Sequence, residues 1–478
     1  MADEKQHIAN LSESPASRSD DEDHEITWTE DEEKTLVRRL DMLIMPLLIL
    51  GFFALQLDRG NIGNALTDNF FQDVGITQFQ FNTGQQLLSA GIVLLEIPSN
   101  VILYRIGPAV WIGAQIIAWG LVATFQAFQK GLGPYLTTRL LLGICEAGFI
   151  PAGLFTMTRW YKRDETSKRF SCYFVGNMSA AASSGLVAYG ILHMRGIAGL
   201  AGWQWLFLIE GLFTVLVGGL FVALFPRSAS NPVSLLGVRY FSDRESQILQ
   251  QRVLRDDPTK IQVRQNVSWA EVKATFTNWR LIPHMLISIL ALSPAQTMGA
   301  YAPSLAVSFG YDRLKANAMI SIGAWILIIT NVSWGIIADK TRLRGLMVFL
   351  GLLFLWGLTL GNRLLVESTN GKLRFGVLTT AIAFQAVFHA VNGSWLALNA
   401  RTAGERSITM ALFIMGANIS GIIGSQIFQA DDAPLYKRGW TVIIALVSAS
   451  VLMSVIAIAQ YWLLNRFQKR VGKDRYLY

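Results

Sequence analysis

Charged residues are scarce in this sequence of 478 residues, in which Asp, Glu, Lys and Arg make up 15% and hydrophobic residues 52%. That composition is too apolar for a soluble enzyme of this length and indicates a protein that crosses a membrane many times. Cysteine and histidine are also rare, with two and five copies. Cys145 and Cys172 cannot build a disulfide framework, and so few histidines disfavour an intramembrane enzyme with metal-binding or acyl-transfer histidines. We therefore expect no enzyme activity and no cofactor.

The N-terminus also lacks a visible signal peptide, because residues 1–33 are polar and hold twelve acidic but only two basic residues, Lys5 and Arg18. We expect residues 1–39 to be a disordered acidic tail and the first apolar helix to act as insertion signal and span. The basic excess of the remaining chain could suggest a nucleic-acid partner. Its Lys and Arg residues instead cluster in short loops between apolar segments, where they orient a membrane protein. We expect no nucleic acid.

Twelve apolar stretches have the ~20 residues that a bilayer span requires. They run about 41–64, 83–105, 109–128, 133–158, 169–194, 203–225, 281–309, 316–337, 345–361, 373–399, 407–428 and 440–464. A polar stretch separates the sixth from the seventh, which is typical of two repeated halves. We predict an all-α polytopic membrane protein with six-helix halves at 40–226 and 281–465, a cytosolic middle loop with short helices at 227–280, and a cytosolic tail at 466–478.

The distribution of Lys and Arg sets the expected orientation. With the N-terminus inside, the inner loops and tails hold most of the basic residues and the outer loops few. We therefore expect a multi-pass protein of the plasma membrane with both termini in the cytosol. In the middle loop, Ser242 with Glu245 and Ser268 with Glu271 have the spacing of capping boxes and predict two short helices.

An aspartate and an arginine, Asp58 and Arg59, stand together in the first span. A charge at the bilayer centre costs roughly 2.5–3.5 kcal/mol on insertion scales, so such a pair indicates a functional site unless it reaches water at the helix end. Neighbours on a helix point about 100° apart, so a regular helix cannot aim both at one ligand. We expect Arg59 to face the ligand.

The fourth span holds a second pair of charges. Arg139 and Glu146 lie on one helix face about 10 Å apart, and Glu146 near mid-span is a candidate proton carrier, because burial favours the uncharged form of an acid. A polar patch with an aromatic, Asn392, Ser394 and Trp395 in the tenth span, suits ligand orientation. We interpret His284 as interfacial. Glu96 is interpreted as part of a kinked cytosolic end, and Glu210 as the partner of a cytosolic Arg.

Several motifs together resemble one known family. Asp58 to Asn61 followed by Ala65 is similar to the first-helix signature of the anion:cation symporter branch of the major facilitator superfamily. Arg139 to Pro151 matches the fourth-helix motif of that branch. Further stretches resemble its fungal allantoate permease-like subfamily, namely Pro98 to Asn100, Trp203 to Gly211, and Asn418 to Gly424. The resemblance covers nearly all of 40–465.

The superfamily's acidic loop is kept in the second half as Gly335 to Lys340, whereas the equivalent first-half loop, Pro98 to Gly107, lacks the acid. Asp339 and Lys340 would have the gating role of this loop. The resemblance implies a rocker-switch fold and proton-driven uptake of anions. Asp58 and Glu146 would be the proton-linked acids. The substrate-binding residues would be Arg59, Arg139, Asn177, Asn392, Ser394, Trp395 and Asn418.

We therefore predict a proton-coupled symporter of a small organic or inorganic anion, such as allantoate, nicotinate, pantothenate, sulfate or a sulfonate. Its partners would be the anion, protons and the lipid bilayer, its driving force the proton gradient, and its state a monomer. An exporter of a secondary metabolite and a nutrient-sensing receptor with the same fold remain the alternatives. Uptake of a labelled anion distinguishes the symporter from the receptor, and the exporter differs from the symporter in the direction of transport.

Overall fold

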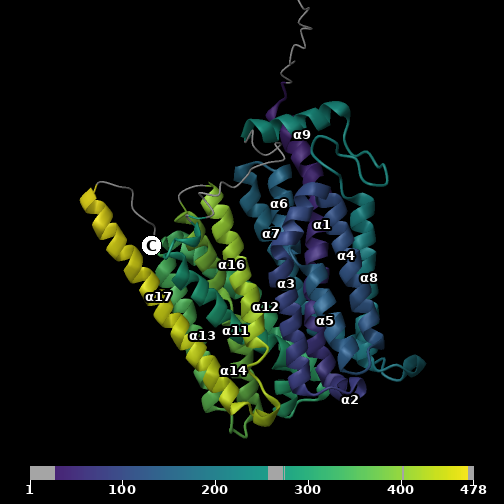
Figure 1. Cartoon of the computed structure of the whole chain (residues 1–478), viewed down its shortest axis with the longest axis vertical. Helices are drawn as coiled ribbons and strands as arrows, with labels where there is room; N and C mark the ends of the chain where they lie inside the picture. Colours follow the sequence, from purple (N-terminus) through teal and green to yellow (C-terminus); the bar gives the residue numbers. More distant parts are fainter. Residues whose placement is uncertain (1–26, 257–272, 274, 401–402, 472–478) are drawn as a thin grey trace, which may run out of the picture.

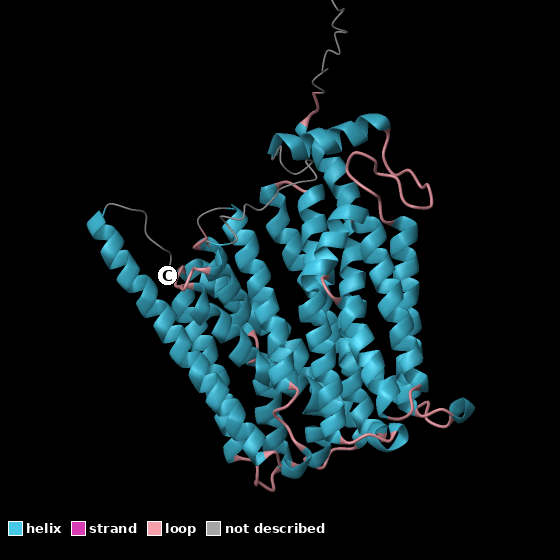
Figure 2. Ribbon diagram, viewed as in Figure 1, coloured by secondary structure: helices cyan, strands magenta, loops and turns pink. Residues whose placement is uncertain are grey.

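The structure is a computed structural model that describes residues 27–256, 273, 275–400 and 403–471. These residues form helices joined by loops, with two isolated β-bridges between 226 and 239. Figure 2 shows the helices as two bundles side by side, and Figure 1 separates the bundles by their position in the sequence. The all-helical architecture in two halves is as predicted.

The N-terminal part of the chain forms the first half, and the C-terminal part forms the second half. The first contains α1 (Glu30–Ala65), the short η1 (Leu66–Asp68) and α2 (Phe70–Val74), α3 (Gln78–Ile106), α4 (Pro108–Phe125), α5 (Leu132–Glu146), α6 (Phe149–Trp160), α7 (Arg163–Leu192) and α8 (Gly202–Leu224). The second contains α11 (Leu281–Ser308), α12 (Arg313–Thr341), α13 (Arg344–Leu364), α14 (Gly371–Phe384), α15 (Val387–Leu398), α16 (Ala403–Gly424) and α17 (Lys437–Val471). In this text, the termini side is the end of the bundles where α1 begins and α17 finishes, and the opposite side is the other end.

Ten helical segments in the described part of the chain are long and apolar enough to span a membrane. The helices α5 and α6 count as one such segment, as do α14 and α15. The helix α7 runs beside them, and α16 contributes a shorter apolar stretch, Ile408–Gly424. The membrane fold is thus confirmed, while the number of twelve spans stays a prediction.

Side-chain caps fix where key helices begin. The hydroxyl of Thr29 accepts a hydrogen bond from the backbone N–H of Glu32, and the Glu32 carboxylate accepts one from the backbone N–H of Thr29. Thr77 and Gln80 make the same reciprocal arrangement at the start of α3. Each capping box satisfies N–H groups that have no partner within the helix. Because α1 begins at Glu30, it extends into the stretch predicted to be a tail.

Two helices are interrupted in the middle of the bundle, where the sequence predicted continuous spans. The fourth segment breaks at Ala147 and Gly148, between α5 and α6, and the tenth breaks at Gln385 and Ala386, between α14 and α15. Gly148 has a φ of +77°, which favours glycine, and a Cβ there would lie 2.6 Å from Ser99 Oγ. Irregular backbone at membrane depth is tolerated where it is buried in protein or lines a cavity. Interruptions in corresponding segments of two halves indicate a binding site.

The helix α9 (Asp243–Asp256) lies across the termini side of the first half (Figure 1). Ser242 and Glu245 form the predicted capping box, with bonds of 2.8 and 3.3 Å. Ion pairs tie α9 to the first half, because Arg252 contacts both Glu33 and Glu165. The helix predicted to begin after Ser268 lies almost entirely outside the described residues.

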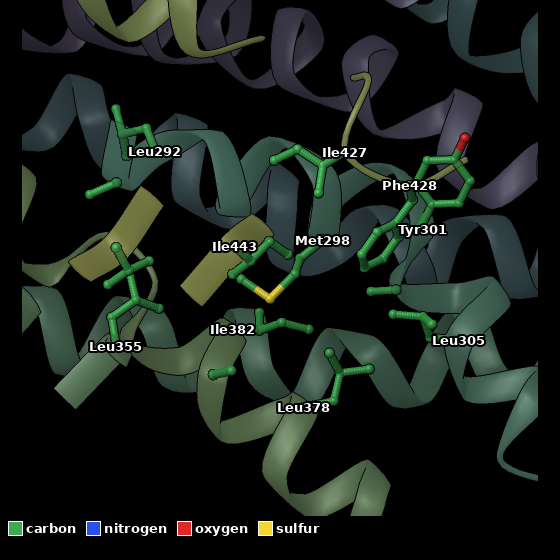
Figure 3. Close-up of a cluster of buried hydrophobic side chains, with 14 of the residues drawn as sticks. Leu292, Met298, Tyr301, Leu305, Leu355, Leu378, Ile382, Ile427, Phe428 and Ile443 are labelled. Atoms are coloured by element: carbon green, nitrogen blue, oxygen red, sulfur yellow. The ribbon is translucent and has the colours of Figure 1, made fainter. Parts of the chain in front are cut away.

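Large apolar clusters fill each half. One lies in the first half around Phe52, Trp119 and Phe149. The other extends through the second half, and Figure 3 shows part of it, including Met298, Leu355, Leu378, Ile382 and Ile443. The second cluster also contains first-half residues such as Phe70, Phe81 and Tyr135, so it continues across the contact between the halves.

Hydrogen bonds join the two halves near the opposite side. Arg313 donates to the carbonyl of Thr67 at 2.8 Å, and Asn317 donates to its hydroxyl at 2.9 Å. Asn82 donates to the carbonyl of Phe428 at 2.9 Å and accepts from the hydroxyl of Tyr301. This side of the interface is therefore held closed in the structure.

Candidate functional site

A polar cavity lies between the two halves, with Arg59 in its wall. It consists of two adjoining volumes of about 100 and 330 Å³ that share Arg59, Gln85, Gln296 and Ala300 as lining residues. The smaller volume also borders Arg139 and Asn418, and the larger one borders Gln385 at the break of the tenth segment. Both halves thus contribute polar side chains to one space.

Arg59 and Glu146 form an ion pair at this cavity. The Nε of Arg59 donates to Glu146 Oε2 at 2.7 Å, and the side chains are 23% and 1% exposed. Glu146 is the last residue of α5, directly before the break at Ala147. The ion pair therefore connects Arg59 in the cavity wall to the break in the fourth segment.

Asp58 points away from Arg59, toward the interior of the first half. Its carboxylate lies 2.9 Å from the hydroxyl of Thr214 on α8, and the residue is 6% exposed. The 100° between neighbours on a regular helix accounts for this separation. Of the two, only Arg59 borders the cavity.

Arg139 is almost completely buried, at 1% exposure, yet it borders the smaller volume. Its Nε and Nη2 have no hydrogen-bond partner, and its guanidinium lies 5.7 Å from the ring centre of Tyr135. A buried guanidinium with free donors is suited to a carboxylate or sulfate, whose oxygens match its planar fork.

Asn418 connects the cavity to the other half. It donates to Glu96 Oε2 at 3.0 Å, so this bond runs from α16 of the second half to α3 of the first. Glu96 is 5% exposed, and Pro98 lies inside the same helix. The signal in the sequence is a polar stripe on α3, in which Gln78, Asn82 and Gln86 also bond to the second half.

Three residues of the tenth span are not brought to the cavity, which corrects their assignment as substrate contacts. Asn392 is fully buried and lies 2.6 Å from His284 Nδ1, and Trp395 packs edge-on against the same imidazole at 4.7 Å. Ser394 accepts a bond from Arg344 at 3.2 Å. The physical reason is that α15 turns these side chains toward the core of the second half. His284 is likewise buried rather than interfacial.

Asn177 stands behind the cavity wall, because it donates at 3.2 Å to Gln56, which borders the larger volume. Asp339 and Lys340 lie exposed at the termini end of α12. Asp339 accepts from Arg344 at 3.0 Å and so joins α12 to α13. These two residues are separate from the cavity.

Glu210 has no ion pair with an arginine among the described residues, contrary to expectation. Both of its carboxylate oxygens are buried without a hydrogen-bond partner.

Other polar residues around the larger volume were not assigned a role from the sequence, because Gln, Asn and Ser are common at helix contacts. They are Gln56, Asn64, Ser184, Asn317, Ser321 and Gln385.

Comparison with known proteins identifies the family. Residues 48–425 match the family model of the Major Facilitator Superfamily. The chain is 31% identical over 456 residues to the uncharacterized transporter YIL166C of Saccharomyces cerevisiae, covering 94% of this chain and 83% of that protein. It is 28% identical over 452 residues to the MFS-type transporter cnsO of Penicillium expansum, covering 92% and 85%.

Solved structures show the same fold. The crystal structure of a D-xylose-proton symporter matches with a TM-score of 0.67 and 12% identity, over 86% of this chain and 97% of that chain. A bacterial homolog of the human lysosomal transporter Spinster, in an inward-facing and occupied conformation, matches with a TM-score of 0.65 and 14% identity, over 88% and 96%. The chain is a multi-pass membrane transporter and not an enzyme, and it belongs to the Major Facilitator Superfamily.

Proposed function

We propose that this chain is a proton-coupled symporter of the anion:cation branch that takes up a small organic or inorganic anion. The observation that carries the proposal is the ion pair of Arg59 with Glu146 in the wall of the cavity between the halves. A guanidinium already paired with a titratable acid can exchange that acid for a substrate anion. The same exchange requires a proton on the acid.

The proposed cycle follows from the cost of moving charge through an apolar interior. A proton that binds Glu146 releases Arg59 to bind the carboxylate or sulfate of the substrate. Arg139 and Asn418, which border the same volume, complete the contacts. With one proton and a monovalent anion the occupied cavity carries no additional net charge, and a divalent anion such as sulfate requires a second proton; the halves can then close around it and reopen on the other side.

The proposed orientation places the termini side in the cytosol and the protein in the plasma membrane. It rests on the Lys and Arg residues that gather in the loops of that side. The bonds from Arg313 and Asn82 between the halves would then close the outer side. Under this orientation the structure corresponds to an inward-facing state.

Transport of radiolabelled anions by cells that express the full chain tests the proposal. The panel should include allantoate, nicotinate, pantothenate and sulfate at two external pH values. We expect accumulation of one class of anion, larger at the lower pH, and its collapse when a protonophore dissipates the gradient. Export from preloaded cells without uptake would instead establish an exporter. Saturable binding without movement in either direction would establish a receptor.

A further inference from the structure

The contact between α1 and α8 holds four buried polar side chains. Asp58 and Asn61 are one turn apart on α1, and Glu210 and Thr214 are one turn apart on α8. Their exposures are 6%, 1%, 1% and 0%. None of them lines the cavity that contains Arg59. This group therefore forms a second polar site inside the first half.

The carboxyl group of Glu210 faces a second acid and an amide rather than a cation. Its electrostatic neighbours are Asp58 and Asn61, and both of its oxygens lack a hydrogen-bond partner. Asp58 Oδ1 and both amide atoms of Asn61 are also buried without a partner. An ionised carboxylate left unpaired in such a place costs several kcal/mol, and two adjacent carboxylates cannot both stay ionised. A proton shared by the two acids removes this cost.

The hydroxyl of Thr214 gives an independent indication of that proton. Its oxygen lies 2.9 Å from Asp58 Oδ2 and 3.0 Å from the backbone carbonyl of Glu210. A threonine hydroxyl has one hydrogen to donate, so it cannot serve two acceptors fully. With a proton on Asp58, the carboxyl donates to Thr214 and Thr214 donates to the carbonyl. Both contacts are then satisfied.

The charged groups around the two acids are unevenly placed. Arg139 and Glu146 of α5 act on Asp58, and Trp119 of α4 presents its indole N–H near the same carboxyl. On Glu210 the only charged neighbour among the described residues is Asp58. The cation Arg139 therefore stabilises a negative charge on Asp58, whereas Glu210 depends on a proton.

We propose that Asp58 and Glu210 form one proton-binding site at the contact of α1 and α8. The one proton has two positions: on Asp58 it is donated to Thr214, and on Glu210 it is donated to Asp58, while Thr214 and Asn61 orient the two acids. The role of this site in transport rests on the proton coupling proposed above, whereas its occupancy by a proton does not.

Infrared difference spectroscopy of the full chain in lipid nanodiscs, titrated with pH in the absence of any transported anion, tests this site. A shared proton predicts one carboxyl C=O stretch that Glu210→Gln abolishes and that Asp58→Asn shifts, because Glu210 keeps a proton when the second acid is gone. The double variant should remove nothing more. The matched control, Glu96→Gln, deletes another buried acid and should leave this band in place. Isotope labelling of the glutamate carboxyl groups in the unchanged chain should shift the band, which keeps the test valid if Glu210→Gln does not fold.

Separate losses that add in the double variant would overturn the shared site, as would a band that neither substitution nor the label alters. The titration is repeated with sodium replaced by choline. A band that responds to sodium would show that the oxygens of this group bind a metal cation instead, which also overturns the proposal. Because no substrate is present, failure of anion uptake in cells and failure of this titration are distinguishable results.

Discussion

The two halves of the molecule differ in the charges that they place inside the membrane. Away from the ends of its spans, the first half carries six Asp, Glu or Arg residues, Asp58, Arg59, Glu96, Arg139, Glu146 and Glu210. The spans of the second half contain no Asp, Glu, Lys or Arg over 281–308, 316–338, 345–362, 375–400, 407–430 and 439–465. The histidines in these spans are His284, which is buried, and His389, which is half-buried. The proposed proton and anion chemistry therefore falls in the first half.

The second half contributes neutral walls and a fixed core. Gln296 and Gln385 complete the cavity opposite Arg59, while His284 is held between Asn392 and Tyr461, at 2.6 and 3.2 Å. This asymmetry indicates that the two halves have different roles: the charge of the first half changes during transport, and the second half closes against it. Four substitutions test this division, in order of decreasing expected effect.

Arg59→Ala should abolish uptake, because the cavity loses its cation and Glu146 is left buried without its partner. Breaking a buried pair in this way costs about 3–5 kcal/mol, enough to suppress transport below detection. Initial rates of labelled-anion uptake at equal surface expression measure the effect. The matched control is Arg363→Ala, which should transport normally. Arg363 lies at the end of α13 that is far from the termini side. Normal uptake by Arg59→Ala would show that Arg59 does not bind the transported anion.

Arg59→Lys keeps the charge but loses the planar fork. Hydrogen bonds to charged groups contribute about 1.5–3 kcal/mol, so the KM for a carboxylate should rise roughly 10–150-fold while expression and thermal stability change little. A KM equal to that of the unchanged chain would show that the anion does not contact the guanidinium in two places.

Asn418→Ala removes the bond between α16 and Glu96 across the halves. Depriving a buried carboxyl of one partner costs about 1–3 kcal/mol, and we expect roughly 5–150-fold slower transport with a smaller change in thermal stability. The control is Asn362→Ala, which removes a bond made within α13 alone. Equal rates for the two variants would contradict a role for the contact between the halves.

His389→Gln should change transport least. His389 stacks on Phe413 at 4.5 Å and is remote from the acids of the first half. If the second half carries no transported proton, the pH profile of uptake should keep its shape and its rate should stay within about twofold. A shift of the pH profile of uptake would show that groups in both halves bind transported protons. That result would contradict the proposed difference between the halves.

Much of the fold could be predicted from the sequence because long apolar stretches and polar loops follow directly from the thickness of a bilayer. The breaks after Glu146 and Phe384 could not, because an interrupted helix keeps an apolar composition on both sides. The capping box of Ser242 and Glu245 was readable, since it depends on residues three positions apart.

The candidate site, too, could be predicted only in part from the sequence. The different directions of Asp58 and Arg59 follow from helix geometry alone, and the structure places Arg59 at the cavity. Asn392 and Trp395 looked equally suitable in the sequence, yet their helix turns them into the core. The lack of a cation beside Glu210 depends on which helices pack together, and one sequence does not contain that information.

The most direct test of the account is accumulation of the transported anion in vesicles that contain Glu146→Gln. The account predicts that a pH gradient no longer drives accumulation, while exchange of labelled for unlabelled anion continues, because the amide cannot carry a proton but leaves Arg59 able to bind. Full gradient-driven accumulation by Glu146→Gln would contradict proton coupling through the Arg59–Glu146 pair.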